Sequence, residues 1–452
     1  RGPAAGPARG AVDVTGDAIA VLGLGRETRE LLAVLDRDEP GTEVVVVDER
    51  AIDTSQLPVT PRLRVTVVAP VDLDDPAALP SGLATIYRSP GVSPYRPAVA
   101  TQVARGVPTT TPTGRWAAQR DNTDVIAITG TKGKSTTAAM TAHLLRAAGR
   151  SVELLGNIGR SAMSAGPRPL ADTIVLELSS YQLVDMSARF GLAGFTTLLS
   201  DHVPWHGSLE RYHADKLRLL WLAERTILDP AVAGHPTVVA ALAGPGTPRR
   251  LAATTSTAHD RLRPALEAAG LLGDHLVRDA ALALALTDAR LEHPDGVAEL
   301  ADSLATMTPL PHRLTPIGSR GGVRFVDDSI STVPESAVAA ARTYLEHGPV
   351  TLLLGGDDRG QDVAPIATLL ADDRVRAVLL PPLGDRWLEP LSAVAGERVE
   401  WAEDLAGAVE LAAERTPAGG TVLLSPAAPS FASYRDFVAR GEHFATLVSH
   451  LP

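Results

Sequence analysis

Residues 126–137 read Ile-Ala-Ile-Thr-Gly-Thr-Lys-Gly-Lys-Ser-Thr-Thr, an apolar strand pattern followed directly by a short glycine-rich loop. Gly130 and Gly133 allow backbone N–H groups to turn toward phosphate oxygens. Lys134 is placed to neutralise the β- and γ-phosphates, and Ser135 to face a magnesium ion at the positive end of a helix. The alternative is an ordinary glycine-rich turn, but glycine, lysine and serine all fall where phosphate needs them. The stretch therefore favours nucleotide binding.

The composition narrows the class of protein. A chain of 452 residues exceeds what one hydrophobic core supports, and we expect three domains. A net charge of −11 without a basic run lacks the electrostatic footprint of a nucleic-acid binder. The absence of cysteine excludes disulfides, thiolate catalysis and cysteine-bound zinc, and it fits the reducing cytoplasm. No run reaches the roughly 18 apolar residues that span a bilayer, so no membrane contact is expected.

Apolar runs rich in β-branched residues alternate with Ala/Leu-rich helical stretches, which indicates α/β architecture with mainly parallel sheets. We predict a disordered lead-in over residues 1–15 and three domains over 16–118, 119–313 and 314–452. In the first domain, a strand that ends in Gly-Leu-Gly at 23–25 predicts a Rossmann-like fold. The central domain is predicted to be of P-loop ATPase type, and the C-terminal domain is again Rossmann-like.

Polar residues follow the predicted strands of the central domain. Glu177 ends the apolar run 173–177, so its carboxylate is expected at the same sheet edge as the phosphate loop, where it suits a magnesium ligand. Another strand is predicted over 195–199, and His202 lies just after it, near a metal or the substrate. Lys216 lies in a predicted helix, and taken alone it is interpreted as a solvated surface lysine.

Several fragments occur together in an order that resembles the Mur ligases, and the resemblance covers almost the whole chain. In the C-terminal domain the chain is most similar to the members that add glutamate to UDP-N-acetylmuramoyl-L-alanine. The fragments are the phosphate loop, Gly-Asn-Ile-Gly at 156–159, Glu-Leu-Ser-Ser at 177–180, Asp-His at 201–202, His-Ala-Asp-Lys at 213–216, Leu-Pro-His-Arg at 310–313, Asp-Asp-Ser at 327–329 and the run 423–431.

The resemblance implies a role for individual residues. Lys216 is implied to be the lysine that Mur ligases carbamylate with carbon dioxide, which turns a cation into a carboxylate-like metal ligand. The implied catalytic residues are Lys134, His202 and Lys216, and the implied metal ligands are Ser135, Glu177, His202 and carbamylated Lys216. ATP is expected at Gly130, Thr131, Lys132, Gly133, Lys134, Ser135, Thr136, His312, Arg313 and Asp328. The UDP-linked substrate is expected at Gly25, Arg26, Ser89, Gly91 and Asn157, and the amino acid at Thr332, Arg359, Ser430 and Phe437.

The implied chemistry is amide bond formation driven by ATP and Mg²⁺. ATP phosphorylates the terminal alanine carboxylate, and the amine of glutamate then attacks the acyl phosphate. The implied partners are UDP-N-acetylmuramoyl-L-alanine, glutamate and ATP. We expect a cytoplasmic monomer that takes part in peptidoglycan precursor synthesis.

Two segments depart from the pattern of the D-glutamate-adding members. A lysine expected after Asp-Ser is replaced by Ile330, and a lysine expected after Gly-Gly-Asp is represented by Arg359, which can bind a carboxylate bidentately. Both segments resemble a subgroup that adds L-glutamate and depends on a separate epimerase. We therefore predict an L-glutamate ligase. In the adenine segment 273–279, two amide positions of the family are occupied by Leu276 and Asp279, and Leu276 cannot hydrogen-bond.

Three alternatives stay open on the sequence alone. The first is the D-glutamate-adding ligase of the same family. The second is a non-catalytic nucleotide-binding regulator, which the altered adenine segment suggests. The third is a relative of folylpolyglutamate synthase, which shares the phosphate loop; the Gly-Leu-Gly turn and Ser-Pro-Gly at 89–91 favour a UDP-sugar instead.

Overall fold

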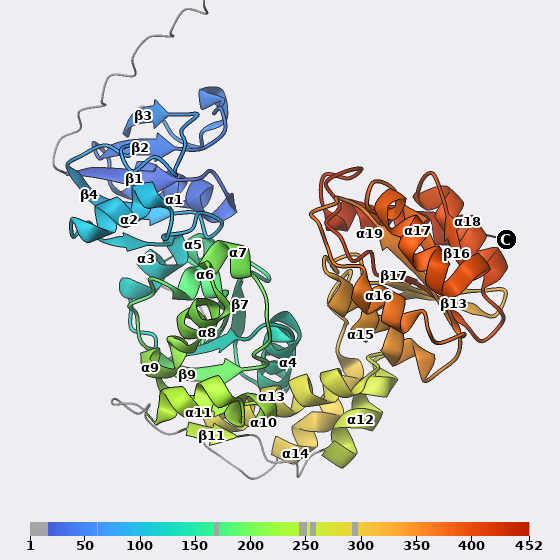
Figure 1. Ribbon diagram of the computed structural model, residues 1–452. Coiled ribbons are helices and arrows are strands. Elements are labelled where there is room, and N and C mark those ends of the chain that lie inside the picture. Colours follow the sequence, from blue (N-terminus) through green and yellow to red (C-terminus); the bar gives the residue numbers. More distant parts are fainter. Residues whose placement is uncertain are drawn as a thin grey trace, which may run out of the picture. The chain divides into compact units, whose positions relative to one another are not determined.

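The computed structural model describes residues 17–60, 62–166, 171–243, 251–253, 259–291 and 297–451. The lead-in predicted over 1–15 lies outside the described residues. Three separate, mainly parallel sheets with connecting helices confirm the predicted α/β class (Figure 1). Among the helices of the described ranges, none combines the length and the apolar character that crossing a membrane requires.

The first sheet has the strand order β3-β2-β1-β4-β5 with every pair parallel, which is a Rossmann-like order. Its central strands are buried along almost their whole length, as expected for a parallel sheet covered on both faces. The strands are β1 (Ala18–Leu22), β2 (Glu43–Val47), β3 (Arg64–Val68), β4 (Leu83–Arg88) and β5 (Thr109–Thr110). The helices are α1 (Arg26–Asp38), η1 (Thr54–Gln56), α2 (Pro97–Ala104) and α3 (Pro112–Ala118).

The second sheet is also parallel throughout, with the order β11-β10-β9-β6-β8-β7. Its strands are β6 (Val125–Thr129), β7 (Val152–Gly156), β8 (Thr173–Glu177), β9 (Phe190–Phe195), β10 (Ala223–Leu228) and β11 (Leu251–Ala253). Its helices include α4 (Lys134–Ala147), α5 (Ala162–Ala165), α6 (Ser180–Leu183), α7 (Val203–His206), α8 (Leu209–Leu217) and α9 (Leu219–Leu222). Further helices are α10 (Pro230–Ala233), α11 (Pro236–Leu242), α12 (His259–Ala268), α13 (Asp274–Leu291), α14 (Val297–Leu300) and η2 (Ala301–Thr306).

The strand predicted over 195–199 is wrong in its position. Strand β9 ends at Phe195, and the residues after it form no regular element. The side chain of Thr197 donates to the carbonyl of Lys132, and the backbone N–H of Leu199 donates to Thr131 Oγ1. These β-prone residues therefore contact the phosphate loop instead of extending the sheet, so tertiary contacts override their intrinsic preference.

The third sheet has the order β12-β13-β17-β14-β15-β16, in which β12 is antiparallel to β13 and the other pairs are parallel. Alternate residues of each central strand contribute to two separate hydrophobic clusters, so the sheet is buried on both faces. The strands are β12 (Thr315–Arg320), β13 (Val323–Asp327), β14 (Val350–Gly355), β15 (Val375–Leu380), β16 (Val399–Trp401) and β17 (Thr421–Leu424). The helices are α15 (Pro334–Leu345), α16 (Ala364–Leu369), α17 (Leu383–Ala395), η3 (Gly396–Arg398), α18 (Leu405–Arg415) and α19 (Phe437–His450).

The described residues form two compact units. The first comprises the residues up to His259 together with Arg278–Ala301, and the second comprises Asp260–Val277 together with the residues from Asp302 onward. The first unit thus holds the first two sheets, and the second unit holds the third sheet. The domain boundaries at 118 and 313 stay predictions.

Candidate active site

The phosphate loop connects β6 to α4 in the first unit, where it was predicted. Helix α4 begins at Lys134, so Ser135 and Thr136 lie in its first turn. Gly130 has φ +152° and Gly133 has φ +85°, backbone conformations that favour glycine. A Cβ on Gly130 would overlap Thr196 Oγ1, so the segment after β9 approaches too closely for any side chain there.

The segment after β9 holds this loop in place. Thr197 donates from Oγ1 to the carbonyl of Lys132, and it accepts from the Lys132 N–H over 2.8 Å. The Thr131 N–H donates to the Thr197 carbonyl at 2.8 Å, and the Leu199 N–H donates to Thr131 Oγ1 at 2.9 Å. The loop is therefore ordered by its neighbours before any ligand binds.

The two lysines of the loop contact different partners, a backbone carbonyl for Lys134 and a carboxylate for Lys132. The Nζ atom of Lys134 donates to the carbonyl of Thr131 at 3.0 Å, which folds this side chain back over the loop. The Nζ atom of Lys132 lies 3.4 Å from Asp201 Oδ2. The ammonium group of Lys134 thus lies against the loop backbone that a phosphate would contact, whereas that of Lys132 faces Asp201.

Lys216, on helix α8, is buried beside the same loop. Its side chain is 2% exposed, and its Nζ donates to the carbonyl of Gly130 at 2.9 Å. Burial lowers the pKa of Lys216 well below its usual value, and the charges of Lys134 and Lys132 lower it further against Asp201 and Glu177. Contrary to the solvated surface lysine that its helix pattern alone predicted, Lys216 is a buried amine whose neutral form is favoured.

Glu177 ends β8, the strand beside β6, and pairs in register with Ile128 just before the loop. The residue is 3% exposed, and its Oε2 atom has no hydrogen-bond partner among the described residues. A buried carboxylate oxygen without a donor is unfavourable unless a cation or proton meets it. Glu177 therefore fits a Mg²⁺ ligand.

His202 follows β9 at a strained point of the chain, with φ +51°. Its Nδ1 lies 2.9 Å from the hydroxyl of Tyr181 and 3.6 Å from Asp201 Oδ1. Partial burial lowers the pKa of His202 despite the charge of Asp201, so the neutral ring that can bind a metal is favoured. In the part of the chain that the structure describes, no three His, Asp or Glu side chains converge as a ready metal site. Mg²⁺ commonly takes one or two carboxylates and completes its shell with phosphates and water.

The residues predicted for the UDP-linked substrate form two neighbouring groups in the first unit. Gly25 lies against Ser89, because a Cβ on Gly25 would come within 2.7 Å of the Ser89 hydroxyl. Arg26 donates from Nη2 to the carbonyl of Gly156 at 2.9 Å, which brings it beside the segment that contains exposed Asn157. The first two sheets thus contribute to one surface.

The segment after β4 also contacts the second sheet through Trp205. The carbonyl of Gly91 accepts from Trp205 Nε1 at 2.9 Å, and Ser93 Oγ donates to the Trp205 carbonyl at 2.9 Å. The ring of Trp205 stacks on Tyr181, with centroids 4.2 Å apart. Since Tyr181 also contacts His202, this stack links the predicted substrate segment to the predicted metal site.

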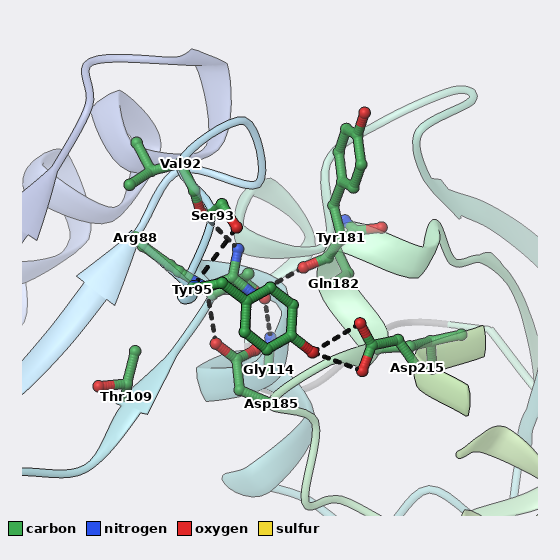
Figure 2. A network of polar contacts seen from close by, with 12 residues as sticks. Arg88, Val92, Ser93, Tyr95, Thr109, Gly114, Tyr181, Gln182, Asp185 and Asp215 are labelled. Atoms are coloured by element: carbon green, nitrogen blue, oxygen red, sulfur yellow. Dashed lines mark hydrogen bonds and ion pairs between the residues drawn. The ribbon is translucent and has the colours of Figure 1, made fainter. Parts of the chain in front are cut away.

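A buried polar network that sequence reasoning missed joins the same two sheets (Figure 2). The hydroxyl of Tyr95 points at the carboxylate of Asp215, at 2.8 and 2.7 Å from its two oxygens. Asp215 also pairs with His206 Nδ1 at 2.7 Å, and His206 Nε2 lies 3.0 Å from Ser180 Oγ. This is the connectivity of a Ser-His-Asp triad, but His206 is fully buried and Ser180 is 2% exposed, so no substrate can reach it. The network therefore positions helix α8 and its Lys216.

A second contact in Figure 2 strengthens the same junction. Arg88 is fully buried and donates from Nε to Asp185 Oδ2 at 2.7 Å. Its Nη2 donates to the carbonyl of Tyr181 at 2.6 Å, and its Nη1 to that of Val92 at 3.1 Å. A guanidinium whose three nitrogens each donate a hydrogen bond tolerates full burial better than an unpaired one, and Arg88 thereby joins the first sheet to the segment of Tyr181 and Asp185.

In the second unit, the predicted nucleotide residues cluster around the end of β13. His312 Nδ1 lies 2.7 Å from Asp327 Oδ2. Asp328 accepts from Ser425 Oγ at 2.6 Å, and burial raises the pKa of Asp328 to about 7 although Ser425 and Arg313 lower it. The Nε atom of Arg313 is buried without a hydrogen-bond partner among the described residues.

The predicted amino-acid residues lie on loops that follow β13, β14 and β17, together with the start of α19. Thr332 and Arg359 are exposed, and Arg359 pairs with Asp357 at 2.9 Å. Ser430 is 4% exposed, whereas the Phe437 ring lies 5.9 Å from that of His312. The structure thus brings Phe437 and His312 together but records no contact that joins Arg359 to Ser430.

The adenine segment occupies the start of α13. Leu276 is 4% exposed, in a buried apolar setting. Asp279 is 7% exposed and lies against the phosphate loop, because a Cβ on Gly133 would come within 2.9 Å of its Oδ2 atom. The altered adenine segment therefore reaches the phosphate loop through Asp279.

Fold and site together define an α/β nucleotide-binding enzyme with a compact phosphate loop beside a buried lysine and a buried carboxylate. Family models match in two places: "Mur ligase middle domain" over residues 128–227, and "Mur ligase, glutamate ligase domain" over residues 312–428. The chain is 36% identical to a UDP-N-acetylmuramoyl-L-alanine–L-glutamate ligase from a Micromonospora species, with 96% of this chain and 97% of that protein covered. A ligase of the same name from Xanthomonas campestris is 35% identical, with 97% and 96% covered. The chain therefore belongs to the Mur ligase family, whose members are ATP-dependent ligases that form carbon–nitrogen bonds.

Solved structures agree with this fold. The MurF ligase of Thermotoga maritima, in complex with ADP, aligns with a TM-score of 0.57 at 14% identity, covering 97% of both chains. The folylpolyglutamate synthase of Mycobacterium tuberculosis, complexed with ADP, aligns with a TM-score of 0.54 at 17% identity, covering 77% of this chain and 97% of that one. At such identities both show the likeness of the fold alone.

Proposed function

We propose that this protein joins L-glutamate to UDP-N-acetylmuramoyl-L-alanine, with hydrolysis of ATP to ADP and phosphate and through an acyl phosphate. The observation that carries the phosphoryl half is the buried amine of Lys216, hydrogen-bonded to Gly130 and close to the charges of Glu177 and Lys134. The names of the relatives that match along nearly the whole chain support the choice of substrates.

In this proposal the phosphate loop binds ATP. Backbone N–H groups of residues 130–133 and the positive end of α4 meet the phosphates, while Lys134 offsets charge on the transferring group. Ser135 and Glu177 hold Mg²⁺, which supplies electrostatic stabilisation of the phosphoryl oxygens. His312, Arg313 and Asp328 contribute to the nucleotide site.

Lys216 is proposed to be carbamylated by carbon dioxide. The nucleophile in this reaction is the neutral amine, and burial together with neighbouring lysines favours that form. The nitrogen of the neutral amine attacks the carbon of carbon dioxide, forms an N–C bond and loses one proton, so an uncharged amine becomes a carbamate anion. The carbamate of Lys216 is then proposed to be a metal ligand together with Glu177 and His202, because metal ions favour an anionic oxygen over an ammonium group.

The second half is amide bond formation. The amine of glutamate attacks the carbonyl carbon of the acyl phosphate, the tetrahedral intermediate expels phosphate, and the amine loses a proton. Arg359 is proposed to bind a glutamate carboxylate, since a guanidinium can bind it bidentately. Ile330, Arg359 and Ser430 are proposed to set the handedness, because inverting the stereocentre redistributes the required cationic and polar contacts.

The test is phosphate release by the full chain with Mg²⁺-ATP and UDP-N-acetylmuramoyl-L-alanine, run with L-glutamate and with D-glutamate in parallel. We expect release with L-glutamate and little with D-glutamate. Release with D-glutamate alone would assign the D-glutamate ligase instead. Binding of ATP without release in either arm would favour a non-catalytic regulator, and glutamylation of a folate in a third arm would favour the folylpolyglutamate reaction.

We propose that the protein acts in the cytoplasm as a monomer in peptidoglycan precursor synthesis, which is the setting that the family resemblance implies. If the product contains L-glutamate, a separate epimerase is proposed to convert it afterwards.

A further inference from the structure

Arg440, on helix α19 of the second unit, is a buried cation whose guanidinium donates four hydrogen bonds. The residue is 3% exposed. Its Nε donates to Ser329 Oγ at 3.0 Å, its Nη1 to the Gly355 carbonyl at 3.3 Å, and its Nη2 to the carbonyls of Ser329 and Ala428 at 2.8 and 3.0 Å. One planar guanidinium thus contacts three separate segments of the chain.

The three segments follow adjacent strands of the third sheet. Ser329 lies after β13, Gly355 is the last residue of β14 and Ala428 lies after β17, and these strands are neighbours in the order β13-β17-β14. Ligands of open α/β sheets bind outside the carboxyl ends of such strands. Arg440 therefore ties together the loops that line this edge.

The same loops carry the residues proposed to bind the amino acid. Thr332 lies three residues after Ser329, Arg359 lies four residues after Gly355, and Ser430 lies two residues after Ala428. Ser430 and Arg440 also line one small cavity of about 80 Å³. Ser329 further donates from Oγ to the carbonyl of Phe437, the first residue of α19.

We propose that Arg440 is a positioning residue that fixes the three loops of the amino-acid site, an inference that rests on the proposed glutamate-binding role of this unit. Its four hydrogen bonds all go to neutral acceptors. Arg440 therefore positions the loops through the planar arrangement of its N–H donors, and not through an ion pair. A lysine carries the same charge but cannot span three segments, because its ammonium lacks the planar arrangement of five donors. Burial lowers the pKa of Arg440 to about 10, and the group stays charged at neutral pH.

The chain offers a matched control in Arg398. It belongs to the same unit and donates to the backbone carbonyls of Leu370, Asp372 and Val375 at 2.6–3.0 Å. These acceptors lie at or just before the amino end of β15, away from the loops that Arg440 holds. Arg398→Lys therefore removes a comparable guanidinium without touching the proposed site.

The experiment compares Arg440→Lys with Arg398→Lys in the full chain, using two measurements. Hydrogen exchange of the ligand-free protein is expected to accelerate about tenfold in residues 328–333, 355–361 and 426–434 of Arg440→Lys, and not in Arg398→Lys. The KM for glutamate is expected to rise about tenfold in Arg440→Lys, while the KM values for ATP and the UDP-linked substrate stay within about twofold of wild type.

Unchanged exchange in the three segments overturns the positioning role, whatever the activity. Accelerated exchange with an unchanged KM for glutamate also overturns the proposal, because the loops would then not form the amino-acid site. A wild-type enzyme that uses neither glutamate enantiomer refutes the proposed function alone, since the exchange measurement needs no substrate. If Arg440→Lys fails to fold, Ser329→Ala removes one acceptor and is expected to accelerate exchange mainly in 328–333.

Discussion

The Nζ atom of Lys216 lies 2.9 Å from the carbonyl oxygen of Gly130, so the buried amine is joined directly to the first glycine of the phosphate loop. The loop and the lysine come from elements that are 86 residues apart in the sequence. Because of this contact, we expect protonation or carbamylation of Lys216 to change the conformation of the loop. Substitutions at either partner are therefore expected to affect ATP use.

Replacement of Lys216 by alanine is expected to lower kcat about 100-fold or more, because a metal ligand and a buried partner of the loop are lost together. If the lysine acts as a carbamate, formate or another small carboxylate restores part of the activity of Lys216→Ala. The measurement is phosphate release with and without formate. Full activity of Lys216→Ala would overturn the metal-site assignment, and a lack of rescue would count against the carbamate.

Gly130→Ala tests the close approach of the segment after β9 to the phosphate loop. At φ +152° an added Cβ overlaps Thr196 Oγ1, and we expect the free energy of unfolding to fall by about 3 kcal/mol and ATP binding to weaken. Gly149→Ala is the control, since φ is +78° there but no atom lies within 4 Å of the added Cβ. It is expected to lose only about 1 kcal/mol. Equal losses in denaturant titrations of the two variants would show that steric overlap plays no part.

The bond from Tyr95 to Asp215 is expected to stabilise the junction of the first two sheets. Tyr95→Phe leaves a largely buried carboxylate with one donor fewer, which should lower the free energy of unfolding by about 1–3 kcal/mol. A double-mutant cycle with Asp215→Asn isolates the interaction. A coupling energy near zero in thermal or denaturant unfolding would contradict this role.

Asp328 should make the stability of the second unit depend on pH. The native carboxyl keeps its proton up to about pH 7, whereas the unfolded one releases it near pH 3.8. Native stability from this group therefore falls as pH rises between these values, by up to about 1.4 kcal/mol per pH unit, and is constant above them.

Asp328→Asn removes this titration. The stability of wild type relative to Asp328→Asn, from guanidinium midpoints in the absence of nucleotide, should decrease from pH 5 to pH 7 and level off above about pH 7.5. A difference that is flat across the whole range would mean that the pKa of Asp328 is not raised.

Arg359→Ala is expected to raise the KM for glutamate about tenfold or more, because a charge-assisted bond to a carboxylate is lost. The control is Arg374→Ala, which removes an exposed guanidinium that likewise pairs with the aspartate two residues before it, Asp372, but lies just before the amino end of β15 and away from this loop. Steady-state assays with varied glutamate should show little change for the control. An unaltered KM in Arg359→Ala would remove this arginine from the amino-acid site.

The sequence predicted the parts of the fold that depend on local pattern. The strands that precede Gly23 and Gly130 and the strand that ends at Glu177 were predicted where they occur, because continuous apolar runs and glycine turns are local signals. The strand over 195–199 was misplaced, since Thr197 and Leu199 are β-prone but bond to a loop about 65 residues earlier.

The site residues also fall into two groups, those that the sequence predicted and those that it did not. Lys216 and Glu177 were found because a family resemblance supplied their context. Arg440 and Asp215 were missed because each has a partner over 100 residues away in the sequence, Ser329 for Arg440 and Tyr95 for Asp215. Nothing in their own neighbourhood distinguishes them from ordinary charged helix residues. A buried charge becomes visible only when its partners are placed around it.

The third sheet has a core of its own. Every buried member of the two clusters that cover its faces comes from residues 314–448, and none comes from the strands beside the phosphate loop. Substitutions that alter the choice of amino acid, as we propose for this unit, can therefore accumulate without repacking the residues around Gly130. A change of amino-acid specificity in such ligases therefore does not require a change in the residues that activate the substrate with ATP.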